Sequence, residues 1–286
     1  MLDDAPDLPA GEGHNFHTHP ELEEMIYVLD GRGSTMVWND AGHRVTFEWK
    51  AGAIFAIPLN TWHQHYNGSG VDPVRFVAVT NAPVIINAFG DLHFVFNTAY
   101  DFKDRFNGEP DYFANKGEQR GLLLDTNFVA DAVNLPLVSA KERGAGGSQV
   151  RFQIAENTMC GHVSQFPVGT YKKAHRHGAG AHVILLSGKG YSLNWKEGEP
   201  KRVDWQQGSM FCPPDEWYHQ HFNTGTEPAR YLALKPKGSP EHPIPLGMPG
   251  PNSNPESMAA NQIEHEDEAP WIYDMYAEEL KKVGLE

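Results

Sequence analysis

Histidines recur in this chain at a spacing that could bind metal ions. A run that reads Trp-His-Gln-His-Tyr-Asn from residue 62 returns as Tyr-His-Gln-His-Phe-Asn from residue 218. A His-x-His pair precedes each run, and the four residues of these pairs are His17, His19, His175 and His177. From the start of each pair to the repeated histidine, His63 or His219, the intervals are 46 and 44 residues. Each half of the chain therefore contains a similar set of three histidines.

The elements that would position these histidines are β-strands. Two histidines one residue apart project from the same face of a strand, because side chains alternate with a period of two. A third histidine from a later strand can then complete a facial set of imidazoles around one ion. The spacing therefore predicts two metal-binding β-barrels in tandem.

The first set also includes a carboxylate, Glu24, seven residues before Gly31. Its candidate metal ligands are His17, His19, Glu24 and His63. Three imidazoles and one carboxylate suit Fe(II), Mn(II), Ni(II) or Zn(II), with open positions for water, O2 or a substrate. The alternatives are that a metal only stabilises the barrel, or that none binds.

The second set differs at the position of this carboxylate. The residue seven before Gly188, the matching glycine of the second half, is Ala181. A metal held by His175, His177 and His219 alone would keep its full charge and about three open positions. Such a site suits a chelating anion together with O2.

A different count gives a different ligand set. Glu24 lies five residues after the second histidine of its pair, and the same count from His177 leads to His182. Since a slip of one residue moves a side chain to the opposite face of a strand, His182 is a possible fourth ligand. We favour Ala181 facing inward, because the glycine turn fixes the strand before it.

Turn residues around the histidines complete a recognisable pattern. The spacing G-x5-P-x-[GN]-x2-H-x3-N runs from Gly52 to Asn67, and Gly208 to Asn223 repeat most of it. Glycine and proline at such positions form tight turns between short strands. In both halves the chain resembles the cupin family, and it therefore resembles a bicupin. This resemblance implies an all-β fold of two tandem double-stranded β-helix, or jelly-roll, barrels.

Within that family the second set is similar in style to the gentisate and salicylate ring-cleaving dioxygenases. The similarity lies in His-Arg-His at 175–177, alanine in the carboxylate position, and His-x-His-x-Asn at 219–223. Those enzymes hold Fe(II) with three histidines and open an aromatic ring between adjacent carbons. The resemblance implies Fe(II) as the cofactor, with Mn, Ni or Zn as alternatives. The implied substrates are O2 and a small hydroxylated aromatic or other chelating carboxylate.

Side chains beyond the ligands could contact a substrate. His65 and His221 lie two residues after the third histidines and share their strand face if the strand is regular. Each could be a donor, an acid or base, or a structural residue. Gln165, Tyr171 and Lys173 precede the second pair and could line the same cavity, where the lysine could pair with a substrate carboxylate or remain solvated. The candidate catalytic residues are His65, Gln165 and His221.

The strand and turn patterns divide the chain into four segments. Period-two stretches predict strands in both barrels, whereas residues 100–147 carry helical and irregular signals. Residues 270–283 predict a short amphipathic helix packed over a barrel end. The expected segments are an N-terminal barrel at 1–100, a linker with helical segments at 101–148, a C-terminal barrel at 149–235, and a Pro/Gly-rich tail with a short helix at 236–286.

The first barrel has only 16 residues before its first histidine, against about 25 in the second. It is therefore short of N-terminal strands: either the chain is truncated relative to its relatives, or the C-terminal segment or a neighbouring subunit supplies the missing strands. Because an open sheet edge promotes association with another chain, we expect a homo-oligomer.

Composition restricts the class of protein. The 286 residues are 40% hydrophobic, with no apolar run near the roughly 20 residues that span a membrane and no N-terminal signal pattern. Two cysteines, Cys160 and Cys212, form no disulfide framework, so we expect a cytoplasmic protein. A formal charge of −14 argues against nucleic-acid or membrane partners. A small anionic substrate remains compatible, because a buried metal ion dominates its local potential.

The sequence thus predicts a non-haem Fe(II) dioxygenase that uses the second barrel. The alternative is a Mn- or Ni-dependent decarboxylase, isomerase or flavonol-type oxygenase that uses the first barrel. A third possibility, from a different class, is a non-catalytic binding barrel stabilised by metal.

Overall fold

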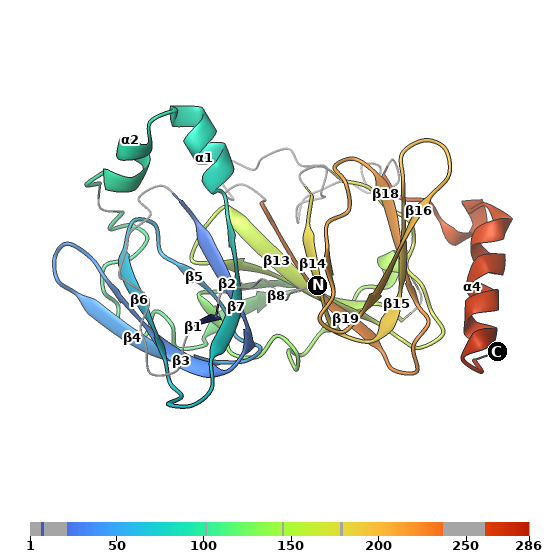
Figure 1. The fold of residues 1–286 in the computed structure, drawn as a ribbon, viewed down its shortest axis with the longest axis horizontal. Helices are drawn as coiled ribbons and strands as arrows, with labels where there is room; N and C mark the ends of the chain where they lie inside the picture. Colours follow the sequence, from blue (N-terminus) through green and yellow to red (C-terminus); the bar gives the residue numbers. More distant parts are fainter. Residues whose placement is uncertain are drawn as a thin grey trace.

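The computed structural model describes residues 7–8, 22–100, 102–144, 146–177, 180–236 and 261–285, which form two β-barrels side by side (Figure 1). In the first barrel, a sheet of order β1-β7-β2-β5-β10 faces a sheet of order β4-β3-β6. The bounds of these strands are β1 Asp7–Leu8, β2 Glu24–Asp30, β3 Arg32–Trp38, β4 Arg44–Lys50, β5 Ile54–Ile57, β6 Trp62–Asn67, β7 Val74–Thr80 and β10 Phe128–Val129.

The second barrel repeats this arrangement with a longer sheet. Its order is β17-β14-β19-β13-β12-β9-β8, with β11 paired to β12, and the facing sheet is β16-β15-β18. The bounds are β8 Gly117–Arg120, β9 Leu123–Thr126, β11 Val138–Ser139, β12 Ser148–Ile154, β13 Met159–Phe166, β14 His182–Ser187, β15 Lys189–Trp195, β16 Lys201–Gln206, β17 Met210–Phe211, β18 Tyr218–Asn223 and β19 Ala229–Pro236.

The strands alternate between an inner and an outer face, as period-two patterning requires. In β4, exposed and buried residues alternate throughout, and Val45, Phe47 and Trp49 pack inside the first barrel. The turns after β2 and β14 contain Gly31 and Gly188, with φ angles of 85° and 89°. Only glycine adopts this conformation without strain, so each turn fixes the phase of the strand that precedes it.

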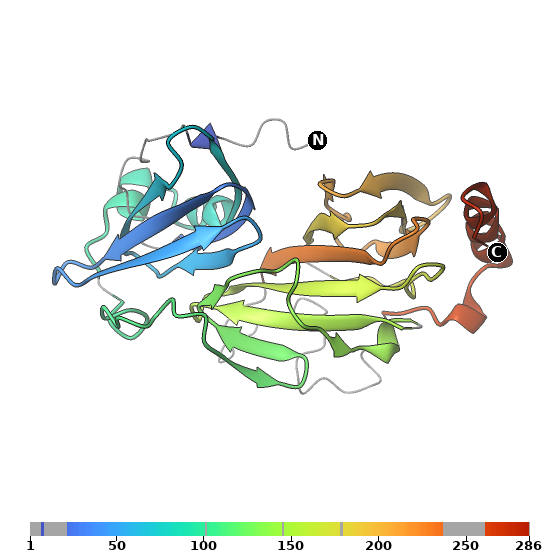
Figure 2. The same ribbon diagram turned by 90° about the horizontal axis from the view of Figure 1, so that it is seen from below.

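The outer faces of the two larger sheets pack against each other and join the barrels. Met25 and Ile54 of the first barrel share one buried hydrophobic cluster with Phe152, Ile184 and Leu232 of the second. Figure 2 shows the barrels next to each other in a second view. The large sheet of the second barrel therefore has a hydrophobic outer face, while its inner face lines the barrel interior.

The segment at 101–148 differs from the expected helical linker. It contains strands β8 to β11 and the 3₁₀ helix η1 (Lys141–Arg143), and two of its residues, Phe128 and Val129, form β10. These strands complete sheets of both barrels: β9 runs parallel to β12, and β10 pairs with β5. Backbone groups at open sheet edges require partners, and this pairing outweighed the local helical signal. The α-helices near it are α1 (Ala82–Phe89) and α2 (Leu92–Asn97), which follow β7.

The edges of the first large sheet are bordered by β1 and β10 rather than by the C-terminal segment. The C-terminal helix α4 (Pro270–Lys282), preceded by the 3₁₀ helix η2 (His265–Asp267), packs instead on the second barrel. Ile272 and Tyr276 of this helix contact Tyr191, Leu193 and Phe222 on the outer face of the small sheet. A homo-oligomer stays a prediction.

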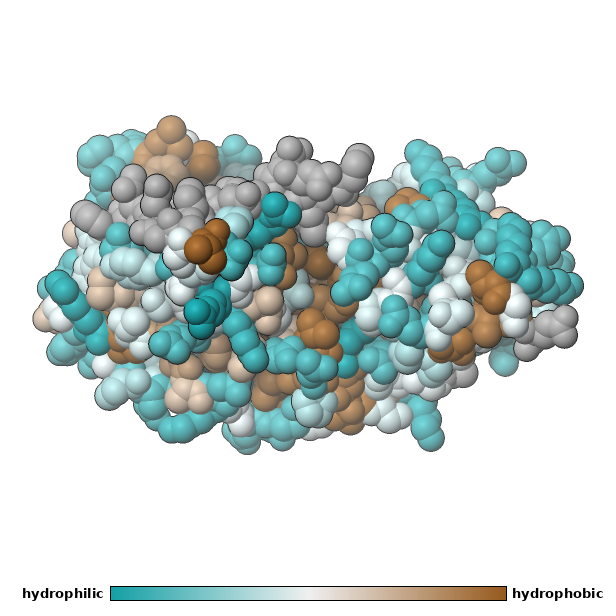
Figure 3. Space-filling view, turned by 60° about the horizontal axis from the view of Figure 1, so that its bottom comes forward, coloured by the Kyte–Doolittle hydropathy of each residue, from teal (hydrophilic) through white to brown (hydrophobic). Residues whose placement is uncertain are grey.

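The surface carries most of the charged and polar side chains. The face drawn in Figure 3 is largely hydrophilic, with hydrophobic residues in small groups. Among the described residues, no helix is long and apolar enough to cross a membrane.

Candidate metal centre

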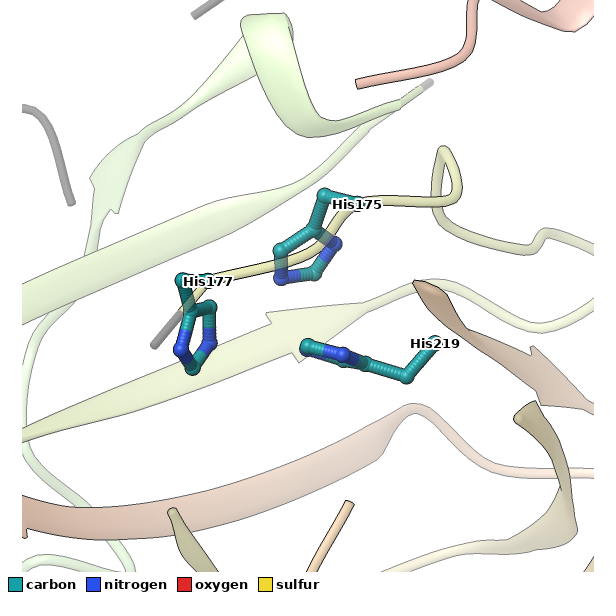
Figure 4. Close-up of side chains that lie close together, drawn as sticks. All are labelled: His175, His177 and His219. Carbon is teal, nitrogen blue, oxygen red and sulfur yellow. The ribbon is translucent and has the colours of Figure 1, made fainter. Parts of the chain in front are cut away.

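Three histidines of the second set lie together inside the second barrel (Figure 4). His175 and His177 lie on the segment between β13 and β14, and His219 lies on β18. One ring nitrogen from each lies within 4.8 Å of the others. The backbone N–H of His175 donates to the His219 carbonyl at 3.1 Å, and the reverse bond is 2.8 Å. This pairing of the two segments brings the three rings, here called the histidine triad, to one point.

Hydrogen bonds to backbone carbonyls orient two rings of the triad. His175 Nδ1 lies 3.2 Å from the Lys173 carbonyl, and His219 Nδ1 lies 3.1 Å from the Trp217 carbonyl. Since a carbonyl only accepts, each Nδ1 donates, and each Nε2 keeps its lone pair for a ligand. This arrangement is typical of histidines that bind metal. The donor set therefore fits a first-row divalent ion.

The structure places Ala181 and His182 on opposite faces of the chain. Ala181 is buried with Val183 inside the second barrel, in the position that Glu24 occupies in the first. His182 is exposed, and its Cα partner on β19 is Leu234, which belongs to the cluster between the barrels. His182 therefore faces away from the histidine triad.

The structure also describes two residues of the first candidate ligand set, Glu24 and His63. His63 Nε2 lies 3.6 Å from Glu24 Oε2, and His63 Nδ1 lies 3.3 Å from the Thr61 carbonyl. The ring thus has the same carbonyl contact, two residues back along the chain, as His175 and His219. His17 and His19 lie outside the described residues, so this candidate site is represented by its glutamate and third histidine.

His221 is held by a relay of three buried side chains. The Trp205 indole N–H donates to Ser192 Oγ at 3.0 Å, and this oxygen lies 2.7 Å from His221 Nδ1. The first barrel contains the same relay, with both distances at 2.7 Å. Its members are Trp49, Thr35 and His65. The sequence reasoning missed these partners, although each hydroxyl residue precedes its tryptophan by 14 or 13 positions and its histidine by 30 or 29.

The relay indicates where His221 carries its proton. Ser192 is fully buried and accepts from the indole, so its single hydroxyl hydrogen is available for His221 Nδ1. When Ser192 donates this hydrogen to His221 Nδ1, the imidazole hydrogen is on Nε2. His221 can then donate one hydrogen bond inside the barrel.

The three remaining candidates, Tyr171, Lys173 and Gln165, point away from the histidine triad. Tyr171 Oη and Lys173 Nζ bond to carboxylates of the C-terminal segment outside the barrel. Gln165 Oε1 accepts a hydrogen bond from Arg230 at 3.2 Å, on the outer face of β13. The structure therefore does not bring Gln165 to the triad.

A bulge in the segment before the histidine pair turns Lys172, and not Lys173, toward the barrel interior. Bridges join Tyr171 to Phe222 and His175 to His219, so four steps on one segment oppose three on the other. The extra residue reverses the inner and outer faces between the two bridges. As a result Lys172, which is 3% exposed, lies inside the barrel, where a regular strand would have placed Lys173.

Burial keeps these imidazoles neutral. Desolvation, followed by neighbouring Arg143, holds the pKa of His175 well below its usual value of 6.5. Desolvation also lowers the pKa of His219 to about 4. For His221 the causes are burial, then His219 and Lys172. A neutral ring is the form that binds a metal.

Comparisons with known proteins agree with this architecture. Residues 7–80 match the family described as the cupin domain. No curated protein sequence matches the chain. Similar solved structures include three variants of oxalate decarboxylase from Bacillus subtilis: a serine-to-alanine variant with TM-score 0.53 and 14% identity, a two-residue deletion with 0.52 and 16%, and a glutamate-to-alanine variant with 0.53 and 15%. Each match covers 80% of this chain and 67% of the other.

The two facing-sheet barrels define a double jelly-roll protein, which confirms the predicted all-β class. The family match shows a cupin domain at residues 7–80, and the two barrels together have the fold of the oxalate decarboxylase structures.

The relay predicts an effect on stability. Ser192→Ala leaves the buried indole N–H of Trp205 and Nδ1 of His221 without their shared partner. Because each unsatisfied buried group costs about 1–3 kcal/mol, we expect the free energy of unfolding to fall by about 2 kcal/mol or more. Urea titration measures this, with the exposed Ser139→Ala change as the control. A loss no larger than that of the control would contradict the relay.

The buried histidines also predict a pH dependence for the metal-free protein. Their folded-state pKa values lie below 6.5, so between about 6.5 and 4 the unfolded chain binds more protons. The free energy of unfolding should therefore be highest above pH 6.5 and fall below it, by up to about 1.4 kcal/mol per pH unit for each histidine. Urea titrations at several pH values, with chelator, measure the slope. His162→Gln should reduce the slope and the exposed His182→Gln should not; equal slopes in both variants would contradict this.

Proposed function

We propose that this bicupin is a metal-dependent enzyme that acts on a small chelating carboxylate at the second barrel. The observation that carries the proposal is the histidine triad, with ligand atoms within 4.8 Å of one another inside the barrel. Carbonyl contacts already orient His175 and His219 with Nε2 available for a ligand.

The proposed ligands are His175, His177 and His219. When bound, the metal ion would supply the positive charge that holds and polarises a chelating substrate. Because Ala181 stands where the first barrel has a carboxylate, the protein adds no negative charge to this set. An anionic substrate is therefore favoured over a neutral one.

His221 is proposed to assist as a hydrogen-bond donor. Its Nδ1 is fixed by Ser192, and its ring lies between Phe211 and Tyr231, with centroid distances of 5.9 and 5.3 Å. A ring held in this way can present its Nε2–H to a substrate oxygen without reorganisation. The aromatic neighbours also limit the access of water.

For the reaction, we propose oxidative cleavage of a small hydroxylated aromatic or similar carboxylate by O2, with Fe(II). The support is the resemblance of the second histidine set to gentisate and salicylate dioxygenases. The second candidate is decarboxylation with Mn or Ni at the first barrel. It is supported by the likeness to oxalate decarboxylase structures and by the approach of Glu24 to His63.

The proposal predicts separate effects of variants in the two barrels. We expect the purified protein to contain one or two equivalents of a first-row metal. His177→Ala should remove about one equivalent and lower turnover by roughly 100-fold or more, because ligand geometry is lost. Ala181→Glu should retain metal but suppress turnover, since the carboxylate takes an open position. Metal analysis, O2 uptake and CO2 release with a panel of aromatic and aliphatic carboxylates measure these effects.

His182→Ala is the matched control and should retain metal and turnover, because His182 faces away from the triad. Turnover that survives His177→Ala but disappears with Glu24→Ala would move the reaction to the first barrel and favour the second candidate. Metal-free protein from a chelator-free preparation would contradict the whole proposal.

A further inference from the structure

The inner face of the large sheet in the second barrel carries a group of basic side chains. In the β12–β13–β19 register, Arg151 lies opposite His162, and Lys235 lies opposite Cys160. Directly opposite residues share a face, and Val150 and Phe152 on either side of Arg151 are buried. Phe152 packs toward the first barrel, so Arg151 faces the interior. Lys235 is buried, at 5% exposure.

Lys172 joins this group from the bulged segment. Its ammonium donates to Ser164 Oγ, on the same inner face, and lies 5.2 Å from the Tyr231 ring centroid and 5.5 Å from that of Phe166. Burial, then Lys235, Lys172 and Arg151, lowers the pKa of His162. The sheet register and this shared neighbour place the three basic side chains around His162, and they are here called the cationic wall.

Two of these cations, Lys172 and Arg151, have no carboxylate within ion-pair distance among the described residues. Within the same part of the chain, Arg151 Nε is buried without a hydrogen-bond partner. The ion pairs of this half, such as Lys173 with Glu264, lie on the outer side. Glu142, which interacts electrostatically with both Lys172 and Arg151, is exposed. A buried cation without a close counter-ion is costly, so Lys172, together with Arg151, requires a functional explanation.

The wall and the histidine triad are close neighbours in one interior. His219 and His221 belong to the small sheet, whereas the wall lies on the large sheet that faces it. Tyr231 lies between them: its ring centroid is 5.3 Å from that of His221 and 5.7 Å from that of His162. His162 also interacts electrostatically with His177 of the triad. A small molecule between the two sheets could contact both groups.

The first barrel offers an informative contrast. Phe76 stands beside His65, with ring centroids 5.6 Å apart, as Tyr231 stands beside His221. Around it, the interior of the first barrel is lined by a hydrophobic cluster that includes Ile26 and Phe55. Within the described residues, the cationic wall is therefore found in the barrel that contains the histidine triad and not in the first barrel.

We propose that the substrate of the second barrel is a dianion, with one carboxylate directed to the histidine triad and a second anionic group held by Lys172 and Arg151. This inference rests on the proposed function for the first contact. The second contact needs only the cationic wall. Ammonium and guanidinium groups form strong charge-assisted hydrogen bonds to carboxylates, and in a buried site these strongly favour two anionic groups over one.

The test measures binding of dicarboxylates by calorimetry to protein loaded with zinc, which is redox-inert. The probes are oxalate, malonate, succinate and glutarate, with acetate as the monoanion. We expect at least one dicarboxylate to bind roughly tenfold or more tightly than acetate, as expected for a charged hydrogen bond. Lys172→Met and Arg151→Met should each remove most of this preference. Lys172→Arg should retain it, and Lys173→Met, next in the chain but outside the barrel, should leave it unchanged.

The same titrations on metal-free protein separate this inference from the proposed function. There the Lys172-dependent preference for a dicarboxylate should persist at lower affinity. If zinc does not bind, the proposed function fails, while the metal-free comparison still tests the wall. No preference for dicarboxylates, or a preference equal in wild type, Lys172→Met and Lys173→Met, would overturn the inference. Thermal unfolding checks that each variant is folded, and Lys172→Arg provides the folded comparison if Lys172→Met does not fold.

Discussion

The interior of the second barrel contains buried imidazoles and basic side chains. Burial removes the water that would otherwise hydrate these groups, so each needs a hydrogen-bond partner within the protein. A buried polar group without a hydrogen bond costs free energy. Carbonyls two residues back along the chain satisfy Nδ1 of His175 and His219, and Ser192 satisfies Nδ1 of His221. These bonds leave the other ring nitrogens directed to the interior. The same hydrogen bonds therefore satisfy the buried Nδ1 atoms and direct the other ring nitrogens toward a ligand.

The two barrels use one scaffold for different interiors. Both keep the tryptophan–hydroxyl–histidine relay, the glycine turns at Gly31 and Gly188, and a bulge before each turn. They differ in what fills the space: hydrophobic side chains dominate around His65, whereas basic groups lie near His221. Because their larger sheets share one hydrophobic cluster, neither barrel can shift its strands without disturbing the other. The first barrel thus supports the sheet whose inner face carries the cationic wall.

The combination of a neutral ligand set and a cationic wall favours an anionic substrate from both sides. Three imidazoles add no negative charge to a bound ion, and Lys172 and Arg151 add positive charge nearby. The surface has the opposite character, with a formal net charge of −14 for the chain. Local fields inside the low-dielectric barrel outweigh distant screened surface charges. The net charge of the chain therefore says little about which ligand the proposed site would bind.

The sequence by itself determined the repeated β architecture, because period-two strands and glycine turns are local signals. It also indicated that His175, His177 and His219 could lie together, since a His-x-His pair shares one strand face and the interval to the third histidine is repeated in both halves.

Which lysine faces the interior was decided only by tertiary structure. One extra residue between Tyr171 and His175 reverses the faces, and that bulge depends on pairing with β18, far along the chain. The strands at 117–129 also arose from pairing with both barrels, which local helical signals could not reveal. The cationic wall likewise joins Arg151, Lys172 and Lys235, whose proximity follows from sheet register rather than from spacing in the sequence.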